Sequence, residues 1–429
     1  MRLPARVRSI EEPQFDLLNT LAARHRARGA DVITLGQAIP GFAPPASALA
    51  ALRAAADDTT SHVYSADAGT AELRAALAEH LSRIASERVQ KVPQGSQGFR
   101  QAPGGSDGFA KSANPEREMI ITAGGNQAFQ LALMTLVDAG DEVLLPAPFF
   151  LNHQMAIQSV GAVPVEVPLD PASGFVPTWE AIAGHVTAKT RAIVLCSPSN
   201  PTGAVTPPAE LQRIVDHCRT HDLVCLIDET YLRFVYDDEP FPATALTAWR
   251  DAVAVIGSFS KAYAVTGWRL GYLIANEDVI AQAMKIQDSM LICASVPIQI
   301  AMTTALRQEP DYPVRYLDEL KDRRDYLLAA LRAVPGLRPV APGGGFFVMV
   351  EMANGGGRRA KDSGRTSARS REVALALIEQ EHVVTIPGRF FGETGEGFLR
   401  LSYGNAPRAR LEEAVARLGR FFAQLRSEV

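Results

Sequence analysis

The sequence predicts an α/β protein whose larger part is a mostly parallel sheet with flanking helices. Between about residues 114 and 260, short apolar runs alternate with amphipathic stretches such as ELQRIVDHCRTHD. Runs this short and apolar are typical of parallel strands that are buried on both faces and joined by crossover helices. The four runs are EVLLP from 142, AIVLC from 192, VCLID from 224 and VAVIGSFSK from 253.

The last hundred residues change character and predict a smaller α+β domain. Helical DELKDRRDYLLAALRAV is followed by the apolar strand GGFFVMVEM, the helix EVALALIEQE, strand-like VVTIPG and FLRLSYG, and a closing helix. We therefore expect an N-terminal arm at 1–50 that contributes to the small domain, a large domain at 51–308 and a small domain at 309–429.

Two segments interrupt this pattern. Residues 92–113 are rich in Gly, Ser, Gln and Pro, and residues 354–371 are rich in Gly, Arg and Ser. Both compositions predict flexible surface insertions, and we expect residues 94–113 and 355–369 to be mobile and dispensable for cofactor binding. The arginines of the second raise a phosphate or RNA contact as an alternative, but without interleaved aromatic residues a solvated loop is favoured.

Bulk composition excludes several functional classes. The 429 residues are 47% hydrophobic and 21% charged, with a formal net charge of -4. Such a balance calls for neither nucleic acid nor an anionic membrane. The N-terminus has no apolar stretch long enough for a signal peptide, so we expect a cytoplasmic protein.

Four cysteines, without CxxC spacing, argue against a zinc site and against a disulfide framework. We expect Cys196, Cys218, Cys225 and Cys293 to be reduced thiols of the core, and we expect no metal.

Lys261, within SFSKAYAVTGWRLGY, is the first candidate for chemistry. A lysine beside small hydroxyl residues suits a Schiff base to an aldehyde cofactor such as pyridoxal phosphate, although a surface lysine is the simpler interpretation. That cofactor also needs an acid to keep its ring nitrogen protonated. Asp228 ends a predicted buried strand and could supply it, or could be a helix N-cap. Tyr231 could reach the ring hydroxyl.

The phosphate of such a cofactor has two candidate anchors. Gly124, Gly125 and Asn126 come where a strand passes into a helix, so backbone N–H groups and the helix dipole converge there. Adjacent glycines also mark ordinary tight turns. Ser258, Ser260 and Arg269 flank the lysine, and a guanidinium gives bidentate contact to a dianion.

Two further positions complete the predicted ring site. Asn200, in SPSNPTGAV, could donate its amide to the ring oxygen, although NPTG is also a good turn sequence. Phe149 and Phe150 could form an aromatic platform, although a pair of phenylalanines is more often core.

Taken together, SPSNPTGAV, LIDETYLRF, SFSKAYAVTGWRLGY and FLRLSYG resemble the motifs of the class I/II, fold type I pyridoxal phosphate aminotransferases, the aspartate aminotransferase superfamily. The resemblance runs from about Ile33 to the C-terminus, and the spacings of 28, 33 and 139 residues from Asn200 through Asp228 and Lys261 to Arg400 are close to those of the family.

The resemblance implies a role for each matching residue. Lys261 matches the Schiff-base lysine and proton shuttle, Asp228 the pyridinium partner, and Asn200 with Tyr231 the pair on the ring hydroxyl. The residues that match the family's phosphate ligands are Ser258, Arg269, Gly124, Gly125 and Asn126, with Ser260 as a weaker candidate. Phe150 matches the residue that stacks on the ring, and Tyr64 matches the tyrosine that reaches the phosphate of the neighbouring subunit. Arg400 and Gly36 match the residues at the substrate α-carboxylate. A role for Tyr64 across an interface implies a homodimer.

These features predict a ping-pong aminotransferase that acts on an L-amino acid and a 2-oxo acid. A lyase, decarboxylase or synthase on the same scaffold is the alternative, because fold does not settle reaction. A non-catalytic pyridoxal-sensing module is disfavoured, since the chain leaves no room for a DNA-binding partner. Asn126 stands where one dicarboxylate-specific subgroup has lysine, and Ile39, Phe42, Phe149 and Phe347 are candidate pocket walls, so we expect an uncharged, aromatic or aliphatic, donor side chain. An arginine of the partner subunit would restore acidic specificity.

Overall fold

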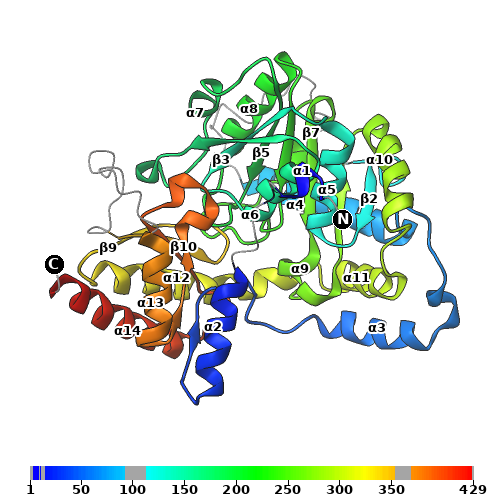
Figure 1. Ribbon diagram of the computed structural model, residues 1–429. Helices are drawn as coiled ribbons and strands as arrows, with labels where there is room; N and C mark the ends of the chain where they lie inside the picture. Colours follow the sequence, from blue (N-terminus) through cyan, green and yellow to red (C-terminus); the bar gives the residue numbers. More distant parts are fainter. Residues whose placement is uncertain (1–2, 9, 11–14, 92–112, 353–368, 428–429) are drawn as a thin grey trace.

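The computed structural model describes residues 3–8, 10, 15–91, 113–352 and 369–427, and the elements named below belong to these ranges. The two predicted insertions lie almost wholly outside them, so their flexibility and dispensability stay predictions. The larger part of the molecule occupies the top and the right of Figure 1, and the C-terminal part lies at its lower left.

A seven-stranded sheet forms the larger part, and β8 runs antiparallel to its two neighbours while the other pairs are parallel. In spatial order the strands are β2 (Met119–Thr122), β8 (Gly271–Ile274), β7 (Val253–Ser258), β6 (Val224–Asp228), β5 (Thr190–Cys196), β3 (Glu142–Ala147) and β4 (Val163–Pro168). The predicted parallel strands are β3, β5, β6 and β7, and the mostly parallel sheet is confirmed.

Successive residues of each central strand pack into different cores, which explains the continuous apolar runs. On β5, Ile193 belongs to the core on one face and Val194 to the core on the other. Helices cover both faces (Figure 1). They are α3 (Ala46–Asp57), α4 (Ala71–Lys91), α5 (Gly125–Leu136), α6 (Leu151–Ser159), α7 (Trp179–Ala183), α8 (Pro208–Thr220), α9 (Phe259–Ala262), α10 (Glu277–Met290) and α11 (Val296–Gln308).

The smaller part is built on a four-stranded antiparallel sheet, with the order β12 (Ile386–Pro387), β13 (Phe398–Ser402), β10 (Phe347–Met352) and β9 (Leu337–Val340). Its helices are α12 (Leu317–Arg332), α13 (Arg369–Glu381) and α14 (Arg408–Ser427). These match the helices and strands that the sequence predicts for the last hundred residues.

The N-terminal segment joins this smaller part. β1 (Ile33–Thr34) pairs in parallel with β11 (Val383–Val384), and α2 (Phe15–Ala27) packs on α13. The short helix α1 (Ala5–Arg8) lies against α6. Domain boundaries at 50 and 308 stay predictions. Within the described ranges, no helix has both the length and the apolarity needed to span a bilayer.

Candidate active site

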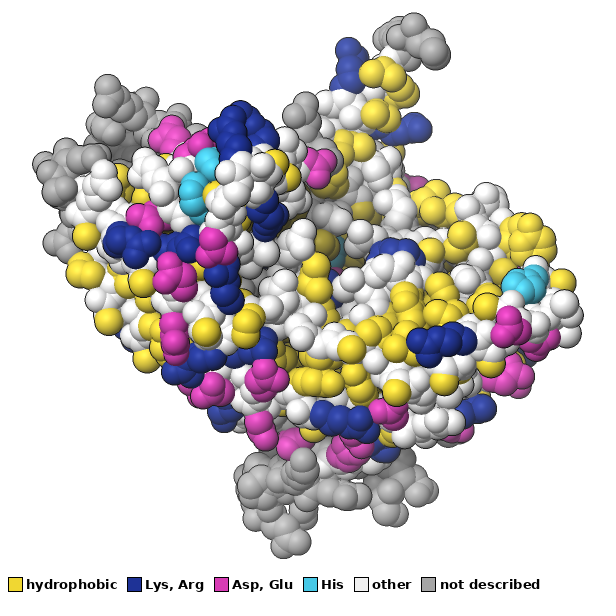
Figure 2. Space-filling model, turned by 90° about the horizontal axis from the view of Figure 1, so that it is seen from below, with side chains coloured by type: hydrophobic (Ala, Val, Ile, Leu, Met, Phe, Trp, Pro, Cys, Tyr) yellow, Lys and Arg dark blue, Asp and Glu magenta, His cyan; other side chains and the backbone are white. Residues whose placement is uncertain are grey.

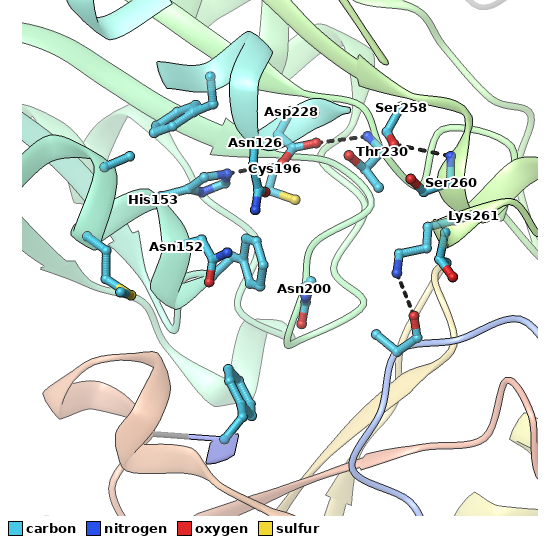
Figure 3. A pocket seen from close by; sticks show the side chains of 18 of the residues that line it. Asn126, Asn152, His153, Cys196, Asn200, Asp228, Thr230, Ser258, Ser260 and Lys261 are labelled. Carbon is cyan, nitrogen blue, oxygen red and sulfur yellow. Dashed lines mark hydrogen bonds and ion pairs between the residues drawn. The ribbon is translucent and has the colours of Figure 1, made fainter. Parts of the chain in front are cut away.

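A cavity of about 630 Å³ opens at the carboxyl ends of β5, β6 and β7 (Figure 3), where open α/β sheets bind their ligands. It brings together residues that are far apart in the sequence. Of the predicted site residues, those lining it are Gly36, Gly125, Asn126, Phe150, Asn200, Asp228, Tyr231, Ser258, Ser260, Lys261, Arg269 and Arg400.

Asp228 is buried at the end of β6 and is held from two sides. His153 Nε2 lies 3.0 Å from its Oδ2, and Thr230 N donates to its Oδ1 at 2.9 Å. An ionised carboxylate only accepts, so the imidazole nitrogen is the donor. Burial pushes the pKa of Asp228 upward, but the hydrogen bonds from His153 and Thr230 outweigh it and leave the pKa below its ordinary value. The group is therefore a carboxylate at neutral pH, suited to pair with a cationic ring nitrogen.

Lys261 lies on α9, directly after the end of β7, and its Nζ donates to the carbonyl oxygen of Ala38 at 2.6 Å. Burial, assisted by the cations Arg400 and Arg269, lowers the pKa of Lys261 to about 8. At this pKa roughly a tenth of the amine is uncharged at pH 7 and about half at pH 8. The uncharged amine is the state that attacks an aldehyde or accepts a proton.

A cradle for an anion forms where α5 begins and α9 follows β7. Gly124 has φ of 86° and stands so close to Arg269 that a Cβ there would overlap the guanidinium. Arg269 Nη1 lies 3.5 Å from Ser260 Oγ and donates to the carbonyl of Thr266 at 2.9 Å. The start of α5, the guanidinium and the hydroxyls of Ser258 and Ser260 together provide the donors that a phosphate dianion needs.

Arg400 reaches the same cavity from β13 of the small sheet. Its Nη1 donates to Asn200 Oδ1 at 2.9 Å and its Nη2 to the carbonyl of Gly36, while the buried Nε has no hydrogen-bond partner among the described residues. Arg400 as a whole residue is 2% exposed, and its guanidinium carbon stands 5.1 Å from the ring centres of Phe347 and Phe391. Burial lowers the pKa of Arg400 to about 10, so it remains a cation that a carboxylate can meet.

Tyr231 and Phe150 complete the predicted ring site. Burial raises the pKa of Tyr231 far above its ordinary value, so its hydroxyl stays protonated and can donate. Phe150 immediately precedes α6, and its ring meets that of His153 edge to face, with centroids 5.5 Å apart.

Two predicted site residues do not line the cavity. Gly124 lies behind the cradle, against Arg269. Tyr64 follows the short helix at Thr59–His62 and is 76% exposed in the single chain. Its predicted contact with the phosphate of a neighbouring subunit stays a prediction.

Three of the four candidate pocket walls are wrong, because their side chains pack elsewhere. Phe149 is buried in the core of the large sheet, and Phe42 stacks on Tyr316 at 3.9 Å. Phe347 is buried beneath Arg400 and does not reach the cavity. Ile39 does line it, together with apolar residues that the sequence did not single out: Ile10, Phe15, Met155, Ala156 and Ile386.

The cysteines are all free, and the expectation of four core thiols is wrong for two of them. Cys218 and Cys225 are buried, whereas Cys196 and Cys293 are partly exposed. Cys196 is the last residue of β5 and therefore lines the cavity beside Asp228 (Figure 3). In the described part of the chain, no group of three or more His, Cys, Asp or Glu could hold a metal ion.

His153 and Thr230 are the functional candidates that sequence reasoning missed. Both contact Asp228. A signal for His153 existed, because it follows Phe150 by three residues at the start of a helix, and that spacing places both side chains on one side. Thr230 follows Asp228 by two residues, the spacing of a side-chain turn.

Comparison with known proteins agrees with this geometry. The family described as aminotransferase class I and II matches residues 30–418. An aspartate aminotransferase of Pyrococcus abyssi is 32% identical and covers 90% of this chain and 91% of its own, and aromatic-amino-acid aminotransferase 2 of Thermococcus litoralis is 33% identical over 90% of each. A solved aspartate aminotransferase of Thermus thermophilus with maleate is 30% identical, has a TM-score of 0.83 and covers 98% of this chain and 100% of its own.

Pyridoxal phosphate, which enzymes of this family use, matches the chemistry of the residues present. The glycine-narrowed cradle beside Arg269 suits a phosphate, Asp228 is an ionised partner for a ring nitrogen, and Lys261 is a partly neutral amine between them. The chain therefore belongs to the class I and II aminotransferases and is an enzyme of that class with pyridoxal phosphate as its cofactor.

Proposed function

We propose that this aminotransferase takes its amino group from an L-amino acid with an uncharged side chain, aromatic or aliphatic, and passes it to a 2-oxo acid in two half-reactions. One observation carries the proposal. Among the described residues that line the cavity, the lysines and arginines are Lys261, Arg269 and Arg400. Lys261 would carry the proton, Arg269 would bind the cofactor phosphate and Arg400 would bind the α-carboxylate. No lysine or arginine of this lining therefore remains to bind a second carboxylate on the donor side chain.

The rest of the wall supports an uncharged side chain. Ile10, Phe15, Ile39 and Met155 are apolar, and the carboxamide side chains that line the same cavity are those of Asn19, Gln37, Asn126, Gln130, Asn152 and Asn200. A carboxamide can donate or accept a hydrogen bond but does not compensate a buried negative charge. One related protein is named for aspartate and another for aromatic amino acids, so membership of the family does not decide between charged and uncharged donors. The lining of the cavity favours an uncharged donor.

The cofactor would be held by residues from both sides of the cavity. Its phosphate would meet Arg269, Ser258, Ser260 and the start of α5, with Asn126 nearby. Its ring would lie on Phe150, with Asp228 at the ring nitrogen and Asn200 and Tyr231 at the ring hydroxyl. When bound, pyridoxal phosphate supplies an aldehyde and an electron-withdrawing ring that acidify the α-proton of the amino acid.

The chain's own residues then divide the work. Lys261 Nζ is the proton carrier, because its lowered pKa keeps it partly neutral and able to accept the α-proton. Asp228 stays ionised and stabilises positive charge on the ring nitrogen. Arg400, with Gly36 beside it, binds the α-carboxylate and fixes which bond of the substrate points at Lys261.

The active unit is a homodimer in this proposal, and its location is cytoplasmic. Val63, Tyr64, Met290 and Leu291 are exposed apolar side chains in the single chain. Figure 2, which views the molecule from below, shows apolar side chains gathered across that face. Exposed apolar side chains that gather on one face are typical of protein interfaces. A buried Tyr64 at such an interface could reach the neighbouring site.

A donor panel tests the substrate class. The purified enzyme with bound cofactor is mixed with L-phenylalanine, L-leucine, L-methionine, L-aspartate or L-glutamate, and the loss of cofactor absorbance is followed without any oxo acid. We expect kcat/KM for the best uncharged donor to exceed that for aspartate by at least about tenfold, the effect of one unpaired polar group at a site. Equal or faster reaction of aspartate or glutamate would overturn the uncharged-donor proposal.

A further inference from the structure

The two sheets meet at a point outside the cavity, where Glu166 of β4 contacts the loop between β12 and β13. Glu166 Oε2 accepts from Glu393 N at 2.8 Å, and Oε1 accepts from Thr394 N at 2.7 Å and from Thr394 Oγ1 at 2.5 Å. One carboxylate thus receives three hydrogen bonds from two consecutive residues. β4 is the edge strand of the large sheet, so this side chain reaches out to the small sheet.

The same loop makes a second bond to the large sheet. Phe149 N, just after β3, donates to the carbonyl of Phe391 at 2.9 Å. Between the two attachments stands Gly392, with φ of 105°, where a Cβ would lie 2.9 Å from Glu166 Oε2 and 2.9 Å from Phe149 Cε1. The loop therefore lies so close to the large sheet that this position has no room for a side chain.

The loop leads directly to the carboxylate-binding arginine. Phe391 is fully buried, and its ring centre lies 5.1 Å from the Arg400 guanidinium. Ile386, at the start of the same loop, is the cross-strand neighbour of Arg400 and lines the cavity. On the other side, Phe149 precedes Phe150, which lines the cavity beside His153. Displacement of the loop would thus shift the wall against which Arg400 rests.

From this geometry we infer that Glu166 is a positioning residue, which fastens the 388–395 loop to the large sheet and thereby holds Phe391 and Arg400 where the substrate carboxylate binds. The inference rests on the proposed role of Arg400. Hydrogen bonds to a carboxylate are stronger than those between neutral groups. Three such bonds on the side chain of Glu166 therefore fix the position of the loop. Glu166 does not line the cavity, so any effect on the substrate passes through the loop and the side chains that rest on it.

The test compares an amino acid with the amine that lacks only its α-carboxylate. For Glu166→Ala we expect KM for L-phenylalanine to rise roughly tenfold, since small misplacements of binding groups have large effects on rate. The slow half-reaction with phenethylamine, which offers Arg400 no carboxylate, should keep the wild-type rate. Cofactor retention should also be unchanged. Glu142→Gln, on neighbouring β3, is the matched control and should leave all three quantities unaltered.

Milder variants keep the test valid if the alanine variant folds poorly. Thr394→Val removes only the hydroxyl bond and should raise KM about two- to threefold, a small share of the effect of a lost hydrogen bond. Glu166→Gln keeps one acceptor oxygen and should fall between. Equal slowing of phenylalanine and phenethylamine, or a normal KM in Thr394→Val and Glu166→Ala alike, would overturn the inference. Should the wild type prefer aspartate, the pair becomes L-aspartate and β-alanine, so failure of the donor proposal is seen separately.

Discussion

The cofactor side and the substrate side of the cavity are built in different ways. On the cofactor side, Asn200, Asp228 and Lys261 each follow the end of a strand of one sheet, and their neighbours along the chain help to fix them. On the substrate side, Arg400 comes from a second sheet, and its contacts are Gly36 and Asn200, which lie 364 and 200 residues away. One sheet therefore supplies the side chains expected at the cofactor, although His153 and Ala38 contact them from 75 and 223 residues away. Two sheets must come together to place the arginine expected at the donor.

The two sides also differ in how their charged side chains are paired. Burial opposes the ionisation of Asp228, but hydrogen bonds from His153 and Thr230 lower its pKa, whereas burial and the cations Arg400 and Arg269 lower the pKa of Lys261. Arg400 keeps one nitrogen, Nε, without a hydrogen-bond partner among the described residues. A buried, unpaired donor in a cation is costly unless a ligand completes it. The contacts of Asp228 and Lys261 are already made within the chain, and we expect the substrate to complete those of Arg400.

The largest expected effect comes from breaking the cofactor side. Lys261→Ala should abolish turnover and remove the visible absorbance of the lysine-bound cofactor, because no other described lysine lines the cavity. Lys285→Ala, on the exposed face of α10, is the control and should behave as wild type. Near-normal transamination by Lys261→Ala would disprove its role.

A smaller effect is expected from the substrate side. Arg400→Lys keeps the positive charge but loses the two guanidinium nitrogens that donate to Asn200 and Gly36 at the same time. We therefore expect KM for the amino donor to rise on the order of 10- to 100-fold. Cofactor affinity should stay at the wild-type value. Steady-state kinetics check the first statement, and the same substitution at Arg408 on the surface of α14 is the control. An unchanged KM in Arg400→Lys would contradict the assignment.

The last expected effect is on stability and not on turnover, and it concerns Glu229, which follows Asp228 but does not line the cavity. It is buried, accepts a hydrogen bond from Ala243 N, and its Oε2 has no partner among the described residues. Burial raises the pKa of Glu229 to about 8. The folded state therefore binds this proton more tightly than the unfolded state does, and the unfolding free energy falls as pH rises from about 4.5 to 8.

Glu229→Gln should remove that fall, which amounts to at most about 1.4 kcal/mol for each pH unit. Urea unfolding at several pH values between 5 and 8 measures it, with Glu142→Gln as a control that should keep the wild-type slope. Parallel pH dependence in the wild type and in Glu229→Gln would show that Glu229 is ionised in the folded protein.

Much of the fold follows from the sequence, because the strands that carry the site are buried on both faces and have unmistakable apolar runs. The antiparallel strand β8 was not predicted, since GYLI is short and looks like any other buried run. Which strands pair is a property of the assembled sheet. Asp228 and Lys261 could be predicted as site residues, because they lie at or just after the ends of strands that the apolar runs identify.

The side chains that surround these residues were harder to predict. Phe149 and Phe150 are adjacent, yet one enters the core and the other lines the cavity, because the chain turns between β3 and α6. His153 meets Asp228 only after α6 has packed on the sheet, 75 residues away in the sequence. The loop that Glu166 holds is set by contacts across 227 and 228 residues, which no local pattern encodes.

In the proposed division of the cavity, one side holds the cofactor and the other selects the donor. The most direct test of this division is the amount of pyridoxal phosphate bound per subunit after extensive dialysis, measured side by side in the wild type, Arg400→Lys and Lys261→Ala. We expect full retention in Arg400→Lys, despite its weakened donor binding, and loss of the lysine-bound cofactor in Lys261→Ala. Loss of cofactor from Arg400→Lys, or its lysine-bound absorbance persisting in Lys261→Ala, would contradict this division.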